Sequence, residues 1–181
     1  MITIPFWLGE LALALIWLAV RVCIWLKNKK IDWKREALLL LMFINLAVLL
    51  RFTFFPFGTV DDHVQPLIFE ADKVLPLRIN WIPYVHLFYF ESRRDLLLNL
   101  IGNTAMFIPS GFILPILYKR LNSFWKVLAA GAGISLCIEL LQLPFHVRAT
   151  DVDDLILNTV GVAIGYGIYA LVRAIRRKKK P

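Results

Sequence analysis

Long apolar runs alternate with short polar stretches along the chain. Five runs come close to the roughly 20 residues that a helix needs to cross about 30 Å of hydrocarbon at about 1.5 Å per residue. They are Pro5–Leu26, Ala37–Phe55, Leu96–Tyr118, Phe124–Leu143 and Leu155–Val172. The pattern predicts an all-α membrane protein, a bundle of five transmembrane helices in a single integral membrane domain that covers residues 1–181.

The positions of the basic residues predict the orientation of these spans. Fourteen of the 21 Lys and Arg residues lie in three places: between the first two runs, around the connection of the third to the fourth, and after the fifth. With five spans these places share one side of the membrane, and an excess of Lys and Arg marks the cytoplasmic side. We therefore expect the N-terminus outside and the C-terminus in the cytoplasm.

Composition agrees with a membrane protein. Hydrophobic residues make up 59% of the 181 residues, above the ~45–50% that is usual for a soluble domain, which excludes an ordinary water-soluble globule. The net charge of +8 could suggest nucleic acid binding, but the basic residues flank the spans. In that place they set topology and attract anionic lipid. We expect membrane lipids as partners and no nucleic acid.

Polar residues enter the spans in one thin layer near the predicted outer ends of four helices. Those within the spans are Arg51, Asn99, Asn103, Glu139, Gln142 and Asn158. Spacings of three or four residues place Asn99 with Asn103, Glu139 with Gln142, and Asp154 with Asn158 on shared helix faces. The last of these faces continues into Gly161 and Gly165, a GxxxG spacing that allows close helix contact. The polar layer is therefore expected to face the interior of the bundle.

Charge inside a membrane is costly and usually marks a functional site with a partner. Arg51 and Glu139 are the predicted pair, and Arg148 could serve one of the acidic residues that precede the fifth span. Those acidic residues are Asp151, Asp153 and Asp154, and the first or second of them could cap the fifth helix. Two interpretations remain open: a structural lock that joins the helices, and a ligand-binding or catalytic site.

The segment from Gly58 to Asp95 is too long for a simple connection. Its second half, Asn80 to Phe90, is strongly aromatic, which is typical of a segment at the membrane interface. We expect it to lie on the outer interface, either as a lid over the polar layer or as a lipid anchor. In the third span, Pro109 and Pro115 predict a kink or a break.

Motifs of known chemistry are scarce. The four serines form no GxSxG elbow, and the three histidines (His63, His86 and His146) lie outside the spans in no metal-binding spacing. The acidic stretch at Asp151–Asp154 could offer oxygen ligands to a divalent cation, but no further metal signature follows it. We expect no metal and no cofactor, and enzymatic activity is not indicated.

The chain resembles the VanZ-like family. The resemblance covers roughly Asn80 to Tyr169 and extends loosely to the first two spans. Its motifs are Asn80-Trp81-Ile82-Pro83, Asn99-Leu100-Ile101-Gly102-Asn103, Pro109-Ser110-Gly111, Glu139-Leu140-Leu141-Gln142, Arg148-Ala149-Thr150-Asp151-Val152-Asp153-Asp154 and Asn158-Thr159-Val160-Gly161. This resemblance implies residence in a bacterial plasma membrane and resistance to teicoplanin-type glycopeptide antibiotics.

Three hypotheses about function follow. In the first, the polar layer binds an amphiphilic ligand such as a lipoglycopeptide antibiotic or a lipid-linked wall precursor, and the aromatic segment holds its apolar part. In the second, an enzyme modifies an outer-leaflet lipid or wall precursor, with Glu139 as base and with Asp151 and Asp154 activating the substrate or holding a cation. The third is a small transporter, for which a broken third span would be the support.

Overall fold

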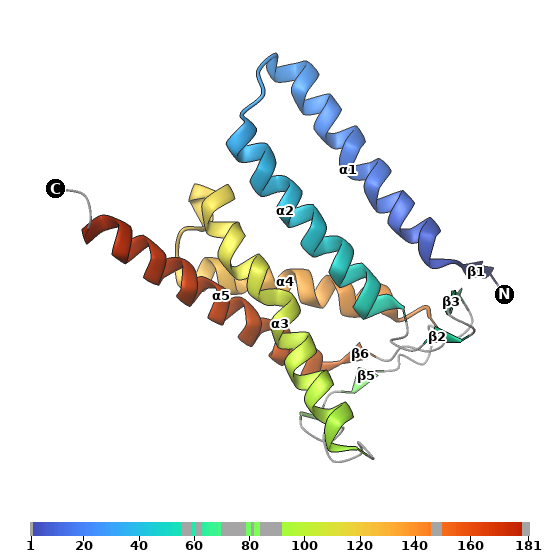
Figure 1. Ribbon diagram of the computed structural model, residues 1–181. Helices are drawn as coiled ribbons and strands as arrows, with labels where there is room; N and C mark the ends of the chain where they lie inside the picture. Colours follow the sequence, from blue (N-terminus) through green and yellow to red (C-terminus); the bar gives the residue numbers. More distant parts are fainter. Residues whose placement is uncertain are drawn as a thin grey trace. The chain divides into compact units, whose positions relative to one another are not determined.

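Five long helices make up most of the computed structural model (Figure 1), which describes residues 2–55, 59–60, 63–69, 79–80, 82–83, 92–145 and 150–178. They are α1 (Phe6–Asn28), α2 (Trp33–Leu49), α3 (Arg93–Leu117), α4 (Phe124–Gln142) and α5 (Val152–Lys178). All five are long and apolar enough to span a membrane, α2 together with a π-helical turn, η1 (Leu50–Phe54), that follows it. The five predicted spans are confirmed.

The chain divides into two compact units. Unit 1 comprises residues 1–77 and 142–148, and unit 2 comprises residues 78–141 and 149–181. Unit 1 therefore holds α1, α2 and η1, and unit 2 holds α3, most of α4, and α5. Each unit is described separately below.

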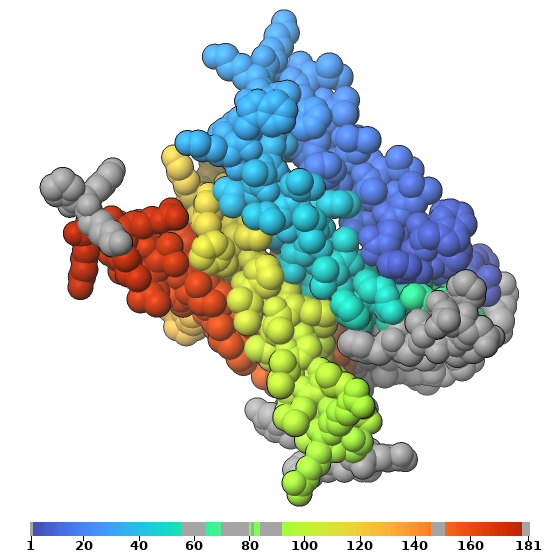
Figure 2. Space-filling model, viewed as in Figure 1, coloured from blue at the N-terminus to red at the C-terminus, as the bar shows by residue number. Residues whose placement is uncertain are grey.

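In unit 1, α1 and α2 form a helical hairpin with a short connection. Lys29 ends α1 in the left-handed conformation, with a φ of 52°, a common way to close a helix. Asp32 caps α2, since its Oδ1 accepts hydrogen bonds from the backbone N–H groups of Lys34 and Arg35 at 3.1 and 3.2 Å. Figure 2 shows the side chains of both helices on the surface of unit 1. Many of these are large and apolar, as expected of helices that face lipid.

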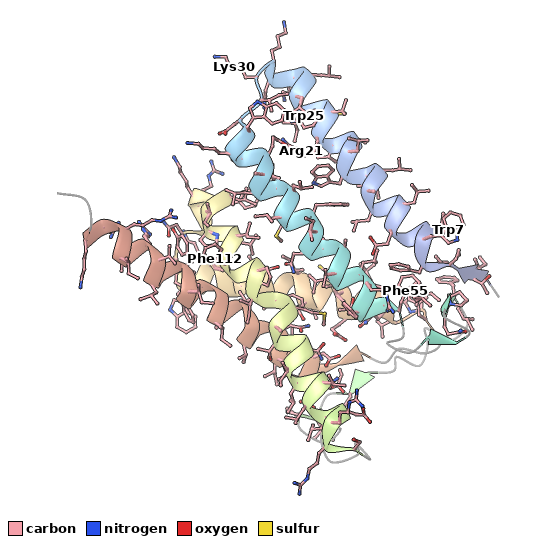
Figure 3. The ribbon with its side chains drawn as sticks, viewed as in Figure 1. Trp7, Arg21, Trp25, Lys30, Phe55 and Phe112 are labelled. Carbon is pink, nitrogen blue, oxygen red and sulfur yellow. The ribbon has the colours of Figure 1, made fainter. Side chains whose placement is uncertain are left out.

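An ion pair joins the two helices of this hairpin. Arg21 on α1 donates from Nε to Glu36 Oε2 on α2 at 2.9 Å, and its Nη2 contacts the other carboxylate oxygen. Figure 3 shows Arg21 and Trp25 on the side of α1 that faces α2. The pair was not predicted from the sequence, although Arg21 and Glu36 are isolated charges in or next to apolar runs.

Short strands correct the all-α prediction. In unit 1, β1 (Ile2–Ile4) pairs antiparallel with β4 (Leu67–Phe69), and β2 (Thr59–Val60) pairs antiparallel with β3 (His63–Val64). The β1–β4 pairing brings the N-terminus to the long segment between α2 and α3, so both lie at the same end of the α1–α2 hairpin. The predicted topology, with the N-terminus and this segment on the same side of the membrane, requires them to lie at the same end of the hairpin. Residues 81 and 84–90 of the aromatic stretch lie outside the described residues, and its role as a lid or anchor stays a prediction.

In unit 2, α3 and α5 cross with their backbones in close contact (Figure 1). A Cβ at Gly161 would overlap the backbone carbonyl of Thr104, and one at Gly165 would overlap the carbonyl of Ile108. On the opposite side of the crossing, Gly111 of α3 leaves no room for a Cβ next to the carbonyl of Val162. The predicted GxxxG contact is confirmed, and its partner is α3.

The third span was predicted to be kinked or broken, and of these alternatives the break is wrong. Helix α3 runs without interruption from Arg93 to Leu117 although Pro109 and Pro115 lie inside it. Proline removes one backbone hydrogen bond and strains a helix, but close packing against α5 keeps this segment helical. A 3-10 turn, η4 (Lys119–Leu121), then leads into α4. The transporter hypothesis loses the observation on which it rested.

A buried cluster of carboxylates and amides in unit 2

Two strands that are far apart in the sequence begin the site. In unit 2, β5 (Ile79–Asn80) pairs parallel with β6 (Thr150–Asp151), and Asn80 lies opposite Asp151. Nδ2 of Asn80 donates to Oδ1 of Asp151 at 3.2 Å. This pairing joins the start of the region that resembles the VanZ-like family to the acidic motif of the same region, 71 residues later. Asn80 belongs to one of the motifs of the family resemblance, but it was not predicted as a site residue.

Asp151 also caps α5. Its Oδ1 accepts from the backbone N–H of Asp153 at 2.9 Å, which satisfies a donor in the first turn of the helix. The predicted cap is confirmed, and Asp151 itself lies in β6 and precedes the helix. A carboxylate at this position is also favoured by the positive end of the helix dipole.

Glu139 connects α4 to the same place. It is buried, with 3% of its surface exposed, and its Oε2 accepts from the backbone N–H of Asp151 at 3.1 Å. A buried carboxylate requires such donors, because leaving water without compensation is costly. The glutamate thus fixes the backbone at the point where β6 turns into α5.

Helices α3 and α5 contribute a further polar contact. Nδ2 of Asn103 on α3 donates to Oδ1 of Asp154 on α5 at 2.5 Å. The predicted polar stripe of α5 therefore meets the predicted polar face of α3. Asp153, next to Asp154, is 5% exposed.

One turn farther along α5, Asn158 is 2% exposed. Its Nδ2 donates to Oγ of Ser135 on α4 at 2.8 Å, and within the described part of the chain its Oδ1 has no hydrogen-bond partner. Exchanging the amide oxygen and nitrogen would leave the other atom unpartnered, so one polar atom of this side chain lacks a partner in either assignment. Such atoms are rare in proteins and call for an explanation.

Ser135 is fully buried, and the sequence analysis did not predict it as a site residue. A signal was available, because Ser135 precedes Glu139 by four residues and therefore shares its helix face. We call the polar residues that make these separate contacts, some buried and some half-buried, the unit 2 cluster: Asn80, Asn103, Ser135, Glu139, Asp151, Asp153, Asp154 and Asn158.

The unit 2 cluster is rich in hydrogen-bond acceptors. Ionised Asp and Glu side chains only accept, whereas the Asn amides and Ser hydroxyl can do both. Among the described residues, no three His, Cys, Asp or Glu side chains are arranged to hold a metal ion. Its chemistry therefore suits a ligand that presents hydroxyl, amide or ammonium donors.

Two predicted site residues lie in unit 1. Gln142 is buried, and its Nε2 donates to the backbone carbonyl of Thr53 in η1. Arg51 lies in the same turn, with its guanidinium 5.5 Å from the centre of the Phe6 ring and 5.3 Å from that of Phe52. Figure 3 shows Phe55, whose carbonyl accepts from Arg51 Nη1 at 3.5 Å, where α1 begins and α2 ends.

Three further site predictions are not decided by these contacts. Arg51 and Glu139 belong to different units, so their pairing stays a prediction. Asn99 is half-buried and takes no part in the hydrogen bonds of the unit 2 cluster. Arg148 lies outside the described residues.

Five apolar helices and a buried polar cluster define a multi-pass membrane protein. The family model described as VanZ/LLP1 matches residues 40–173, which is more than half of the chain, and the chain belongs to this VanZ-like family. It is 36% identical over 82 residues to "Protein VanZ" of Enterococcus faecium, a match that covers 45% of this chain and 50% of that protein. The chain thus matches about half the length of this curated relative. No solved structure matches the chain.

Proposed function

We propose that the protein resides in a bacterial plasma membrane and that the unit 2 cluster binds the polar part of an amphiphilic ligand at the outer leaflet. The observation that carries the proposal is the acceptor-rich cluster, in which Glu139, Asp153 and Asn158 are buried. Among the described residues, Oδ1 of Asn158 has no hydrogen-bond partner. A purely structural lock has no use for such an atom, because leaving a buried polar atom unpaired costs about 1–3 kcal/mol. A ligand donor or acceptor could satisfy it.

The chemistry of the cluster suggests which amphiphiles suit it. Four carboxylates make it a poor site for a phosphate and a good one for hydroxyl, amide or ammonium donors. A teicoplanin-type lipoglycopeptide combines a peptide core, rich in such donors, with an acyl tail, and a lipid-linked wall precursor combines donors with a lipid in a similar way. Family membership supports the first choice. We propose that the protein contributes to resistance by binding the antibiotic at the membrane surface.

Resistance is tested by expressing the protein in a bacterium that lacks any relative and is susceptible to teicoplanin. We expect the wild type to raise the inhibitory concentration of teicoplanin and to leave that of a glycopeptide without an acyl tail almost unchanged. Glu139→Gln and Asp154→Asn are expected to lose this protection. Asp95→Asn is the matched control, since Asp95 is exposed at the start of α3, outside the cluster.

Three results would contradict the proposal once immunoblots show equal protein levels. The first is no change in susceptibility with the wild type. The second is full protection by both cluster variants, and the third is an equal loss of protection with Asp95→Asn.

The enzyme hypothesis is separated by a lipid analysis of the same strains. In support of this alternative, Glu139 Oε2 accepts from the backbone N–H of Asp151 at 3.1 Å, so the two residues that would act on the substrate are neighbours. A new or modified lipid that appears with the wild type and disappears with Glu139→Gln would replace binding by catalysis. Binding predicts identical lipid profiles in all strains.

A further inference from the structure

A cavity lies at the other end of α5 from the unit 2 cluster. It has a volume of about 300 Å³ and is lined by Tyr166, Tyr169, Ala170, Arg173, Ala174 and Arg177. Residues spaced by three, four and seven positions share one face of a helix, so the cavity follows a single stripe of α5. We call it the basic-end cavity.

Asn122, which follows η4, orders two of the lining side chains. Its Oδ1 accepts from Arg173 Nη1 at 2.8 Å and from the Tyr169 hydroxyl at 3.1 Å. The ring of Tyr169 lies 5.7 Å from that of Tyr166 and 6.4 Å from that of Phe112, a residue that Figure 3 labels on α3. The cavity wall is therefore a set of packed aromatic rings with an ordered guanidinium at its edge.

The depth of these residues matches the layers of a lipid leaflet. The apolar part of α5 ends at Val172, so Arg173 is the first residue beyond it and Arg177 follows one turn later. Tyr169 and Tyr166 precede Arg173 by four and seven residues, about 6 and 10 Å deeper at about 1.5 Å per residue. Arginine at headgroup level with tyrosine just below it is typical of a membrane interface.

No described residue neutralises the positive charge of the cavity. Within the described residues, neither Arg173 nor Arg177 forms an ion pair, and Asn122 is a neutral partner. An arginine fork binds phosphate through two parallel hydrogen bonds, and two forks one turn apart can hold one phosphate group. The rings and the small side chains of Ala170 and Ala174 leave space for the apolar part of the same molecule.

We propose that the basic-end cavity binds the headgroup of an anionic phospholipid. Its phosphate lies on Arg173 and Arg177, and its glycerol and upper acyl chain lie along Tyr169 and Tyr166. This site is separate from the proposed antibiotic site, and either can fail without the other.

Native mass spectrometry tests the proposal on the full-length protein, freed of lipid in an uncharged detergent. We expect phosphatidylglycerol to bind more tightly than phosphatidylcholine with the same acyl chains. Arg177→Ala is expected to weaken phosphatidylglycerol binding about fivefold, because a basic residue near an anionic membrane surface contributes about 1 kcal/mol. Arg173→Ala should weaken binding at least as strongly. Arg177→Ala is the cleaner variant, because Arg177 makes no hydrogen bond within the described residues and its replacement is expected to leave the fold intact.

Arg176→Ala is the matched control, since it removes the same charge from an exposed position next to the cavity. We expect it to change binding less than twofold. An equal loss with Arg176→Ala would mean a general attraction to the positive tail and would overturn the site. Glycerol 3-phosphate in excess should not displace the lipid. Displacement would show that the cavity binds a free phosphate group without the acyl chains, and it would overturn the assignment to a phospholipid. Equal binding of the two lipids would also overturn the proposal.

Discussion

Asn103 on α3 and Asp154 on α5 are joined by a hydrogen bond of 2.5 Å from Nδ2 to Oδ1. The two residues are separated by 51 positions and lie on the helices whose glycines cross in close contact. The same crossing thus combines a backbone contact that tolerates no added carbon with a hydrogen bond to a carboxylate. Both the hydrogen bond and the close backbone contact can be tested by substitution.

The hydrogen bond is tested by a double-mutant cycle with Asn103→Ala and Asp154→Ala. We expect a coupling free energy of about 1 kcal/mol, since hydrogen bonds between membrane helices contribute about 0.6–1.7 kcal/mol. The measurement is reversible unfolding in mixed micelles. Asn99→Ala is the control, because Asn99 lies one turn earlier on α3 and takes no part in this contact. The change in unfolding free energy caused by Asn99→Ala should add to that of Asp154→Ala. If the changes caused by Asn103→Ala and Asp154→Ala were also additive, the hydrogen bond between these residues would be contradicted.

The glycine crossing predicts opposite effects of one substitution at two positions of α5. Gly161→Ala places a Cβ against the carbonyl of Thr104 and should destabilise the protein by about 1–3 kcal/mol, the usual cost of overpacking. Gly167→Ala meets nothing within 4 Å and should be neutral or stabilising by up to about 1 kcal/mol, because alanine is the better helix former. Thermal unfolding monitored by size-exclusion chromatography compares them. Equal stability of the two variants would contradict the crossing.

The ion pair of unit 1 predicts that removing one partner is worse than removing both. Arg21→Met leaves the Glu36 carboxylate, whose side chain is 12% exposed, without its guanidinium and should cost about 3–5 kcal/mol. Adding Glu36→Leu should restore a large part of this loss, because no buried charge remains. Lys27→Met, an exposed position on the same helix, should change the melting temperature very little. A double variant no more stable than Arg21→Met would contradict the pairing.

The predicted orientation is tested by labelling single cysteines in intact cells. In a background of Cys23→Ala and Cys137→Ala, we expect Arg93→Cys to react with a membrane-impermeant maleimide from outside. Lys30→Cys and Arg176→Cys, both exposed and at the basic ends of α1 and α5, should react only after permeabilisation. The reverse pattern would invert the topology and place the unit 2 cluster at the inner leaflet.

Local pattern was enough to locate the helices. Each span could be predicted because hydrophobic length against a membrane of fixed thickness is a property of consecutive residues. The cap at Asp151 and the close contact of Gly161 and Gly165 were predicted for the same reason, since capping and small-residue spacing depend on neighbours in sequence. The prolines of α3 show the limit of such reasoning, because packing against α5 outweighs their local preference.

The candidate site was predicted in part. Asn103, Glu139, Asp151, Asp153, Asp154 and Asn158 were identified from depth and helical spacing, and the structure brings them together in unit 2. Asn80 and Ser135 were missed as site residues. Asn80 reaches the cluster because β5 pairs with β6. Ser135 belongs to it because its hydroxyl oxygen accepts a hydrogen bond from Asn158 on another helix.

The sequence by itself determined that the chain has five helices long and apolar enough to cross a membrane and that polar residues lie near their ends, because both follow from the order of apolar and polar residues. Only the tertiary structure decided which polar groups meet, that Arg21 pairs with Glu36, and that one amide atom of Asn158 has no partner among the described residues. The GxxxG spacing predicts that α5 makes a close helix contact, but which helix it meets, and at which rotation, depends on residues far apart in the sequence.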